Sequence, residues 1–445
     1  MAREGDLIKI GFSFPLGGSS SCDVLEFLGG GGQGEVYKVK MDGNEYALKW
    51  YFQRQQTSDL KKSLNDLVVK GAPSAAFLWP KRVIEYKGSF GYIMDLRPPH
   101  YKNSQGLLSR KINLDYKKIC FAALQIVDAF YQLHRNGLAY QDVSFGNIFL
   151  NPKDGGVLIC DNDNVAAHLT SVAGITGTMG FMAPEVVLGK HMPDQYSDAF
   201  SMAILLFRMM FLEHPFDGSR WANEECPSDE FRKKIYGENP IFIFDRNNDT
   251  NRPDPNLQSN AKKFSRLYPS YIKDVFHKVF TDGILDREHG RPSQNPEADW
   301  IEALRRMRSS IFACASCGEL MLYDEAKKGE LICFRCKTKA NPPVRLVIKI
   351  GKRERSLALF PDTKILYYQL QKSTVYGLKE GDAIMGEMAQ NPKSPGKWGI
   401  RNLTKDNWFF SNKGEEEKTC EPGKAIALKA GLNIRFGAAV GEILT

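Results

Sequence analysis

The hydrophobic pattern of this chain changes period near residue 100, and this change limits the folds that the chain can adopt. Before it, short strand-type runs are separated by glycine-containing turns, with one helical segment among them. After it, apolar side chains recur at helical spacing. The strand-type runs are 24–28, 35–40, 45–51, 83–86 and 92–95, the early helix is 57–70, and the later helices are 115–133, 201–207, 271–281 and 297–308. The sequence therefore predicts an α+β fold in which a small sheet precedes a larger helical region.

The composition excludes several classes of protein. The chain has 445 residues, enough for two or three domains, and it lacks an apolar run long enough to predict a membrane-spanning helix. The N-terminus lacks the apolar segment of a signal peptide. A formal charge of +8 is too diffuse over this length to predict nucleic-acid binding. Nine cysteines without a disulfide-type spacing indicate a reducing compartment, so we expect a cytoplasmic protein.

A polar loop between two short apolar runs carries groups that suit phosphoryl transfer. Asp142 and Asn147 lie five residues apart, and Asp161 ends the second apolar run. The oxygens of Asn147 and Asp161 would suit Mg²⁺, which would leave Asp142 to accept a proton. A polar hairpin without any catalytic role would show the same residues, so the loop alone does not decide between the two interpretations.

A glycine-rich segment and a lysine favour the catalytic interpretation. Gly29, Gly31 and Gly34 match G-x-G-x-x-G, and the segment leads into a strand, which argues against a dinucleotide-binding fold. Backbone N–H groups without side chains can approach phosphate oxygens closely. Lys49 follows Gly34 by 15 residues and ends the next strand, where it could reach the same phosphates or could simply be a solvated surface lysine.

Taken in order, these motifs resemble a eukaryotic-type (Hanks-type) serine/threonine protein kinase domain over residues 23–308. The resemblance rests on the glycine loop, Tyr46-Ala47-Leu48-Lys49, Met94-Asp95-Leu96, Tyr140-Gln141-Asp142 with Asn147, Asp161, Ala183-Pro184-Glu185, Asp198 and Arg291. It implies a bilobal fold with an N-lobe at 23–96 and a C-lobe at 97–310. It also implies that Asp198 braces the catalytic loop and that Arg291 pairs with Glu185.

The resemblance further implies a cofactor, a metal and a set of roles. Asp142 would be the base, Lys49 would hold phosphates, and Asn147 and Asp161 would bind Mg²⁺. The residues that it assigns to ATP binding are Gly29, Gly31, Gly32, Gln33, Gly34, Val36, Ala47, Lys49, Met94, Asp95 and Leu96. Thr178, before the Ala-Pro-Glu motif, favours a serine or threonine in a protein substrate as the acceptor. The candidate autophosphorylation sites are Thr170, Ser171 and Thr176.

Two departures from the family pattern bear on regulation and turnover. Gln141 replaces the arginine that usually docks an activation-loop phosphate, so switching by that route is not expected. Ser144 replaces a lysine that would neutralise the γ-phosphate, which predicts slow turnover. The alternative function is therefore a nucleotide-binding pseudokinase scaffold that recruits partners through its C-terminal parts.

Two further departures concern the carboxylates near the lysine. Asn162 and Asp163 replace the phenylalanine and glycine that usually follow the metal-binding aspartate, and we expect Asp163 to be solvated rather than to bind metal. No glutamate lies between Lys49 and residue 84, so the usual helix-borne partner of the lysine is missing. Asp66, on the predicted helix, is the expected substitute, ahead of Asp59.

Two Cys-x-x-Cys pairs predict a zinc ribbon at residues 311–340. Thiolates at this spacing suit a closed tetrahedral zinc site, and zinc would fold a segment too short for a core of its own. The alternative is a set of buried or redox-active thiols. The predicted ligands are Cys314, Cys317, Cys333 and Cys336. The basic residues Lys327, Lys328, Arg335, Lys337 and Lys339 are expected to be surface residues rather than nucleic-acid contacts.

Residues 341–445 predict a small β-sandwich that follows a linker at 341–343. Its strand-type runs are 345–350, 364–368, 398–403 and 434–437. The segment 399–437 resembles the second half of a forkhead-associated domain, whereas the Gly-Arg and Ser-x-x-His parts of the first half are missing. We therefore expect a protein-binding sandwich with Asn407 as its only candidate phosphate contact.

After a leader at 1–22, the order of a kinase domain, a zinc ribbon and a sandwich is similar to that of bacterial kinases of the tellurite-resistance type. The loop sequence Gln-Asp-Val-Ser-x-Gly-Asn also resembles that group. This resemblance implies bacterial signalling or stress response. It also implies a phosphatase of the 2C class and a von Willebrand A-domain protein as partners beside the protein substrate.

Overall fold

The computed structural model describes residues 7–16, 20–170, 177–291, 296–327, 330–340, 343–373, 375 and 377–445. The chain forms two compact units. The first comprises Met1–Asn113, Ala129–Met209 and Asn223–Ile241, and the second comprises Leu114–Asp128, Met210–Ala222 and Phe242–Thr445. Within the described ranges, no helix has the length and apolar character needed to cross a membrane.

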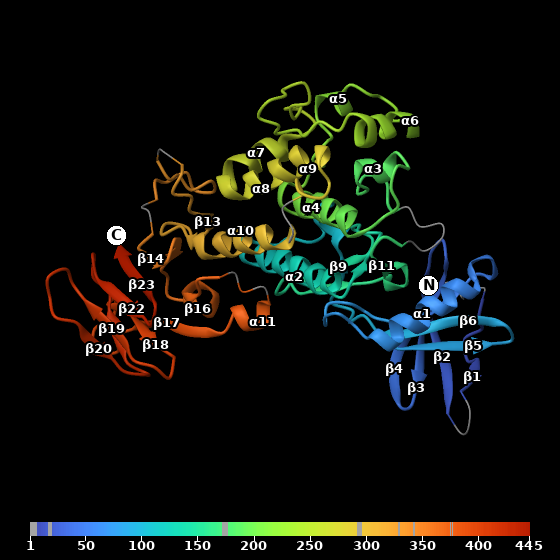
Figure 1. Ribbon diagram of the computed structural model, residues 1–445, viewed down its shortest axis with the longest axis horizontal. Helices are drawn as coiled ribbons and strands as arrows, with labels where there is room; N and C mark the ends of the chain where they lie inside the picture. The colour runs from blue at the N-terminus through green and yellow to red at the C-terminus, as the bar shows by residue number, and fades with distance from the viewer. Residues whose placement is uncertain are drawn as a thin grey trace. The chain divides into compact units, whose positions relative to one another are not determined.

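A six-stranded antiparallel sheet begins the first unit, in the order β1-β2-β3-β4-β6-β5 (Figure 1). Its strands are β1 (Ser13–Pro15), β2 (Ser21–Gly30), β3 (Gly34–Met41), β4 (Asn44–Tyr51), β5 (Arg82–Tyr86) and β6 (Ser89–Asp95). This confirms the predicted strand runs. The predicted leader adds strand β1, which pairs with β2, and its Phe14 is buried in a core with Val24 and Tyr37.

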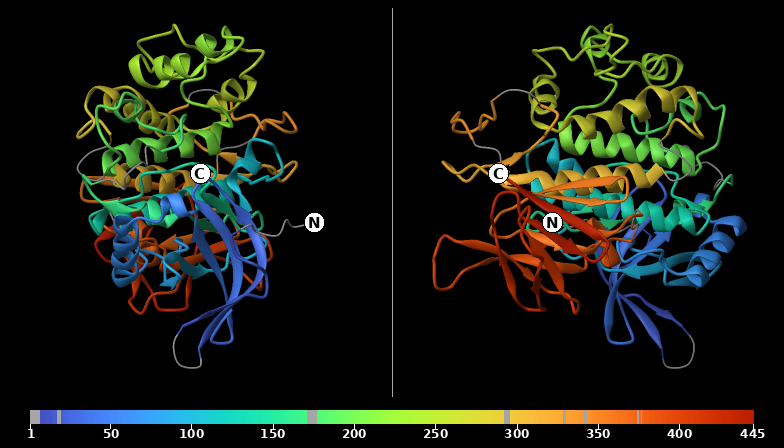
Figure 2. Two further views of the ribbon diagram at one scale, coloured as in Figure 1. Left: turned by 90° about the vertical axis from the view of Figure 1, so that its right-hand side faces the viewer. Right: turned by 60° about the vertical axis from the view of Figure 1, so that its left-hand side comes forward.

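Helix α1 (Ser58–Lys70) lies against this sheet, as Figures 1 and 2 show, and confirms the predicted early helix. The Thr57 hydroxyl accepts a hydrogen bond from the Leu60 N–H at the first turn. Gly71, at φ 73°, follows the last turn in a conformation that favours glycine. Leu64 and Leu67 are buried, so the helix contacts the sheet through an apolar stripe.

The rest of the first unit carries the polar loop. Strands β10, β9 and β7 form a three-stranded sheet in that order, and β8 pairs with β11. These strands are β7 (Lys102–Asn103), β8 (Leu138–Ala139), β9 (Ile148–Leu150), β10 (Val157–Ile159) and β11 (Ala166–Ala167). The other helical segments of the first unit are α3 (Pro184–Val187), α6 (Asp229–Lys233), η1 (Gln53–Gln55), η2 (Ser104–Leu107), η3 (Asn162–Asn164) and η4 (Lys234–Glu238).

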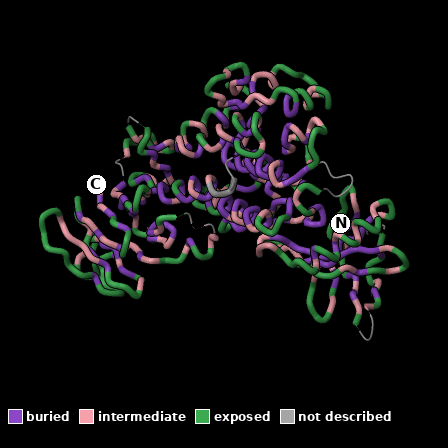
Figure 3. Tube along the Cα trace, viewed as in Figure 1, coloured by how far each residue is buried: buried purple, intermediate pink, exposed green. Residues whose placement is uncertain are grey.

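Helices α2 (Tyr116–Arg135) and α4 (Gln195–Phe211) contribute residues to both units. Helix α4 is buried along most of its length, as Figure 3 shows, and this agrees with its nearly uninterrupted apolar sequence. The other helices of the second unit that precede the cysteine-containing segment are α5 (Ser219–Ala222), α7 (Ser259–Leu267), α8 (Ser270–Phe280), α9 (Asp282–Leu285) and α10 (Pro296–Ser310). Helices α8 and α10 confirm the last two predicted helices.

A short cysteine-containing segment follows α10. It begins with the hairpin β12 (Ile311–Ala313) and β13 (Leu320–Leu322). After the hairpin, Asp324 Oδ2 accepts a hydrogen bond of 2.8 Å from the Ser270 N–H in the first turn of α8. Lys327 Nζ donates to the carbonyls of Arg266 and Tyr268 at the end of α7, at 2.8 and 3.3 Å. The segment therefore supplies hydrogen-bond partners to the ends of two helices.

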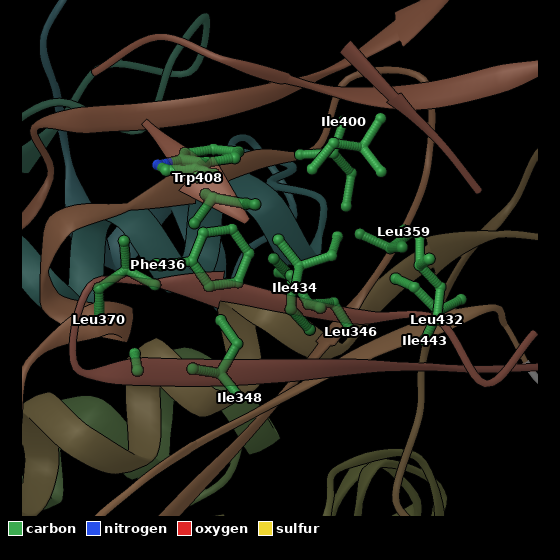
Figure 4. Close-up of a cluster of buried hydrophobic side chains, with 14 of the residues drawn as sticks. Leu346, Ile348, Leu359, Leu370, Ile400, Trp408, Leu432, Ile434, Phe436 and Ile443 are labelled. Carbon is green, nitrogen blue, oxygen red and sulfur yellow. The ribbon is translucent and has the colours of Figure 1, made fainter. Parts of the chain in front are cut away.

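Two antiparallel sheets form a sandwich in residues 343–445, which confirms the predicted sandwich. Their order is β15-β14-β23-β22-β19-β20 in one sheet and β16-β17-β18-β21 in the other. Figure 4 shows the shared core, in which Leu346, Trp408 and Ile434 from one sheet lie beside Ile400 from the other. The strands are β14 (Arg345–Ile350), β15 (Arg353–Ala358), β16 (Lys364–Leu366), β17 (Ile384–Gln390), β18 (Trp398–Asn402), β19 (Trp408–Ser411), β20 (Lys418–Cys420), β21 (Ala425–Ala427), β22 (Asn433–Phe436) and β23 (Ala439–Leu444).

Polar contacts join α10 to the sandwich within the second unit. Arg308 forms a two-pronged ion pair with Asp382, with nitrogen–oxygen distances of 2.7 and 2.9 Å. Gln369 Nε2 donates to Ser309 Oγ at 3.1 Å. Gln369 lies in the 3₁₀ turn η5 (Tyr367–Leu370), and the short helix α11 (Leu378–Gly381) precedes Asp382. The prediction of a strand over 364–368 was therefore wrong at its end, and most of the predicted linker at 341–343 lies outside the described residues.

Candidate active site

The loop between β8 and β9 is held in place by a buried carboxylate of α4. Asp198 accepts hydrogen bonds from the backbone N–H groups of Tyr140, at 2.6 Å, and Gln141, at 2.9 Å, and its Oδ2 lies 3.2 Å from His134 Nε2. Gln141 has a φ of 73°, which turns two successive N–H groups toward the same carboxylate. The Tyr140 hydroxyl donates to the Cys160 carbonyl on the neighbouring hairpin. Asp198 thus has the bracing contacts that the sequence predicted.

Asp142 is the partly exposed carboxylate of this loop. Asn147 Nδ2 donates to the Asp142 carbonyl at 2.9 Å and to its Oδ2 at 3.1 Å. Thr178 Oγ1 donates to Asp142 Oδ1 at 2.7 Å. Both carboxylate oxygens are therefore oriented by neighbours, and the Asn147 amide nitrogen is used by these contacts. The Asn147 Oδ1 atom remains the one suited to bind a cation.

Asp161 follows β10 and adopts the left-handed conformation, with φ 50°. Its carboxylate is 44% exposed and lies 3.4 Å from Lys49 Nζ. The Cys160 N–H donates to the Asn147 carbonyl at 2.9 Å, which ties the ends of β9 and β10 together. Burial raises the pKa of Asp161, and Lys49 opposes that rise. An amide oxygen and a carboxylate on neighbouring strand ends fit the ligand preferences of Mg²⁺.

The glycine loop has open space along its backbone. A Cβ atom added at Gly29, Gly31 or Gly32 would meet nothing within 4 Å, so phosphate oxygens could approach the backbone closely there, although the Gly31 N–H itself donates to the Gly34 carbonyl at 2.9 Å. Gly34 differs, because an added Cβ would lie 2.1 Å from the Trp50 carbonyl oxygen on β4. Gln33 Oε1 accepts a hydrogen bond of 2.8 Å from Lys49 Nζ, and its Nε2 donates to Asn164 Oδ1 at 3.3 Å.

The residues predicted to surround an adenine ring form one apolar cluster. Ala47 and Met94 are opposite each other on β4 and β6 and are both buried. Val36 and Leu96 are partly buried and pack against the same cluster. Asp95 is exposed, with its carboxylate 2.7 Å from Lys81 Nζ. The structure therefore brings together the expected apolar residues, and the backbone of residues 94–96 is the expected hinge beside them.

Lys49 does not pair with the predicted residue of α1. Asp66 and Asp59 are both exposed on that helix, so the expectation that Asp66 substitutes for the missing glutamate was wrong. Lys49 Nζ instead lies 3.0 and 2.8 Å from the two oxygens of Asp163. Asp163 was expected to be solvated, and this was also wrong, because the residue is 1% exposed. The second acid of Asp161-Asn162-Asp163, combined with the missing glutamate, is the sequence signal that could have identified this partner.

The other departures also have defined contacts. Gln141 Nε2 donates to the carbonyls of Thr170 and Pro193. Asn162 is fully buried and donates to the carbonyls of Leu78, at 2.8 Å, and Ile159, at 3.0 Å. Ser144 is buried within the loop. Of the candidate autophosphorylation sites, Ser171 and Thr176 lie outside the described residues.

The predicted pairing of Arg291 with Glu185 stays a prediction. Arg291 is buried, and its Nε donates to the Gly283 carbonyl at 2.8 Å. In the sandwich, Asn407 is exposed, whereas Asn402 is fully buried. Asn402 donates to the carbonyls of Asp406 and Cys420, at 2.8 and 3.2 Å, and its role is therefore structural.

The four predicted zinc ligands converge. The Sγ atoms of Cys314, Cys317, Cys333 and Cys336 all lie within 4.8 Å of one another. Two of the separations, Cys314 to Cys336 and Cys317 to Cys333, are 3.7 Å. A tetrahedral site with Zn–S bonds of about 2.3 Å has sulfur–sulfur separations of about 3.8 Å. Hydrogen bonds from Thr338 lower the pKa of Cys336 to about 6, which favours the thiolate that zinc binds. This donor set fits zinc.

Comparison with known proteins agrees with this geometry. The family model described as "Protein kinase domain" matches residues 22–270, which is more than half of the 445-residue chain.

The chain is 27% identical to the serine/threonine-protein kinase AtPK1/AtPK6 of Arabidopsis thaliana, over 49% of this chain and 47% of that protein. It is 30% identical to the serine/threonine-protein kinase ppk16 of Schizosaccharomyces pombe, over 39% of this chain and 25% of that protein. It is 26% identical to the serine/threonine-protein kinase sck2 of the same yeast, over 43% of this chain and 31% of that protein. The chain thus spans less than half of the length of these relatives. With the glycine loop, the lysine, the polar loop and Asp161 assembled as described, the chain belongs to the protein kinase family.

Proposed function

We propose that this protein is an Mg-ATP-dependent serine/threonine protein kinase that phosphorylates a protein substrate. The assembly of Lys49, Asp142, Asn147 and Asp161 within the first unit carries this proposal. Asp142 is partly exposed and oriented by two hydrogen bonds, so it could receive the proton of an acceptor hydroxyl. A positioned general base of this kind contributes ~10²–10⁴-fold to the rate.

The other residues of the site would bind and orient the nucleotide. The uncrowded backbone of the glycine loop and Lys49 Nζ would hold phosphate oxygens, and the apolar cluster around Ala47 and Met94 would receive the adenine ring. Asn147 Oδ1 and the Asp161 carboxylate are the metal ligands that the chain provides. Bound Mg²⁺ would offset the negative charge of the phosphates during transfer.

The experiment that tests the proposal compares phosphate transfer from labelled Mg-ATP by the wild type, by Asp142→Asn and by Asp66→Asn. We expect transfer to the protein itself or to generic acceptors, a loss of ~10²–10⁴-fold in Asp142→Asn, and no change in Asp66→Asn. Asp66 is an exposed acid, so its variant controls for the change of charge. Equal transfer by the wild type and Asp142→Asn would contradict the proposal.

A nucleotide-binding scaffold is the second candidate, and Ser144 favours it. This residue places a buried hydroxyl where the family has a lysine, so the loop provides one positive charge fewer for the transferred phosphate. Such a scaffold would be stabilised against heat by Mg-ATP and would show no transfer above the Asp142→Asn background. If the wild type transfers phosphate and Asp142→Asn does not, the protein is a kinase and the scaffold is excluded as its main function.

The four cysteines would hold one structural zinc ion, and the sandwich would bind a protein partner. The fit of the sulfur positions supports the first statement. The second rests on the resemblance of residues 399–437 to a forkhead-associated domain, with Asn407 as the exposed candidate contact. Zinc would hold together a segment that provides hydrogen bonds to the ends of α7 and α8.

The wider setting is also part of the proposal. The loop sequence and domain order support a role in bacterial signalling or stress response, with a 2C-class phosphatase and a von Willebrand A-domain protein as partners. The nine cysteines are all free thiols, which supports a reducing, cytoplasmic location. We keep the division into 1–22, 23–310, 311–340 and 341–445 as the proposed domain boundaries.

A further inference from the structure

We propose that Asp163, fixed by two tyrosine hydroxyls, positions Lys49 for nucleotide binding in place of a carboxylate on helix α1. Lys49 lies on β4 and is 5% exposed, and its Nζ contacts both oxygens of Asp163 at 3.0 and 2.8 Å. The contact to Asp161 is longer, at 3.4 Å. This inference rests on the proposed kinase function, because it assigns a role within the same site.

The tyrosines hold Asp163 from the side of the sheet. The Tyr51 hydroxyl donates to Asp163 Oδ2 at 2.6 Å, and the Tyr92 hydroxyl donates to Oδ1 at 3.1 Å. Both tyrosines are buried, and they lie on the neighbouring strands β4 and β6. Each carboxylate oxygen therefore has one tyrosine donor and the lysine. A buried ion pair persists only when additional hydrogen bonds satisfy its remaining atoms, and this pair meets that condition.

Helix α1 contributes only apolar contacts at this place. Leu64, which is fully buried, packs in the same cluster as Tyr51 and Tyr92. The acids of the helix, Asp59 and Asp66, are exposed. The position of Lys49 is therefore tied to the sheet and to the Asp161–Asp163 segment rather than to a charge on the helix.

The 3₁₀ turn η3 separates the two nearby carboxylates. The Asp161 side chain is 44% exposed, where a cation could reach it, whereas the Asp163 side chain is 1% exposed and contacts the sheet. Asn162 Nδ2 anchors the turn to the Leu78 carbonyl at 2.8 Å, and Asn164 Oδ1 receives a hydrogen bond from Gln33 at 3.3 Å. One short segment thus presents a candidate metal ligand on one side and the lysine's partner on the other.

The test is a double-substitution cycle in the full-length chain with Asp163→Asn and Lys49→Met. The measurements are the dissociation constant of Mg-ATP and, separately, kcat and KM for ATP. We expect Asp163→Asn to lower kcat/KM by ~10²-fold, because a displacement of about 1 Å in a positioned group has an effect of that size. We expect the double variant to be no worse than Lys49→Met alone, because Asp163 acts through Lys49. Effects that multiply in the double variant would overturn the proposal.

Two further variants separate positioning from folding. Tyr51→Phe and Tyr92→Phe each remove one hydroxyl and keep the aromatic ring, and each is expected to weaken Mg-ATP binding by ~5-fold, as for one lost hydrogen bond. Asp66→Asn should leave binding unchanged. Full-strength binding by both tyrosine variants would overturn the proposal. A third outcome separates this proposal from the proposed kinase function. If Mg-ATP binding by the four proteins follows the expected cycle but the wild type transfers no phosphate, only the proposed kinase function is contradicted.

Discussion

Gln141 shows how a single residue can keep the geometry of a site and change its chemistry. Its backbone has a φ of 73° and donates its N–H to Asp198, as a catalytic loop of this family requires. Its side-chain amide, in contrast, bonds to the carbonyls of Thr170 and Pro193. An amide carries no charge to attract a phosphate, whereas a guanidinium does. We therefore do not expect activation-loop phosphorylation to be sensed at this position.

The glycines of the phosphate loop differ in what each position requires. Gly34 lies opposite Tyr51 in the register of β3 and β4, and an added Cβ would meet the Trp50 carbonyl oxygen at 2.1 Å. We expect Gly34→Ala to lower the free energy of unfolding by about 1–3 kcal/mol, because the two backbones must separate. Thermal or denaturant unfolding, monitored by circular dichroism, would measure this loss.

Gly31→Ala is the matched control for that substitution. An added Cβ at Gly31 would meet nothing within 4 Å, so the free energy of unfolding should change by less than about 0.5 kcal/mol. Equal destabilisation by the two alanine substitutions would contradict the assigned contact between Gly34 and β4.

Among the elements, helix α1 was predictable from the sequence, and its electrostatic role was not. Leu60, Leu64 and Leu67 at helical spacing predict the helix and its buried face. The partner of Lys49 is instead a residue 114 positions away in the chain. It lies in a 3₁₀ turn that the sequence pattern does not predict. Local periodicity carries no information about such a contact, so reasoning by position on the helix selected the exposed Asp66.

The Asp324 carboxylate of the cysteine segment accepts a hydrogen bond from the first turn of α8, so its contribution to stability should depend on pH. Burial would raise the pKa of Asp324, but hydrogen bonds from Ser270 and Ala326 overcome this and lower it. The unfolded chain therefore takes up the proton first as the pH falls, so this stabilisation is present above about pH 4 and is lost as the pH falls through the lower folded-state pKa.

We expect Asp324→Asn to lower the free energy of unfolding at pH 7 by about 0.3–1 kcal/mol, because the negative charge at the N-terminus of α8 is lost while an amide oxygen can still accept the hydrogen bond. The difference from the wild type should shrink as the pH falls below about 4, because the carboxyl of the unfolded wild type takes up a proton there and that of the folded protein does so at lower pH. Urea unfolding at pH 7 and pH 3 would measure both effects. Asp362→Asn, at an exposed acid of the same unit, provides the control. A difference that grows on acidification would contradict the assigned capping role.

For the molecule as a whole, the sequence indicated the sandwich but not all of its strands. The run 345–350 was predicted with the observed bounds of β14, because four of its six residues are apolar and three of these are β-branched. Strand β15 (Arg353–Ala358) was missed, because its sequence Arg-Glu-Arg-Ser-Leu-Ala is polar, and pairing with β14 makes it a strand. Pairing with β14 in a hairpin, rather than the intrinsic preference of its own residues, therefore determines β15.

The ion pair between Arg308 and Asp382 joins α10 to the sandwich, so a substitution there should affect the whole second unit. Both nitrogen–oxygen distances are below 3 Å, and the side chains are 23% and 28% exposed. We expect Asp382→Asn to lower the free energy of unfolding by about 1–3 kcal/mol, because charged hydrogen bonds are lost while Arg308 stays partly buried.

The measurement is calorimetric unfolding of the full-length chain, and Glu387→Gln is the control. Glu387 pairs with Arg401 inside the sandwich, where both side chains are more exposed. Its loss should therefore cost less than about 1 kcal/mol. A larger effect of Glu387→Gln than of Asp382→Asn would show that the joint between α10 and the sandwich contributes little.

Strand β1 has a practical consequence for anyone who shortens this protein. A fragment limited to residues 22–270, the part that the family model matches, would lack β1, the strand that pairs with the start of β2 at Ser21–Asp23. The side chains of Leu25 and Leu28 on β2 are already exposed. An unpaired edge flanked by exposed leucines is a template for aggregation between copies, whereas the short strand β1, which ends in Pro15, blunts that edge. Strand β1 therefore covers the first part of this edge, and its removal would expose that part to pairing with another copy of the chain.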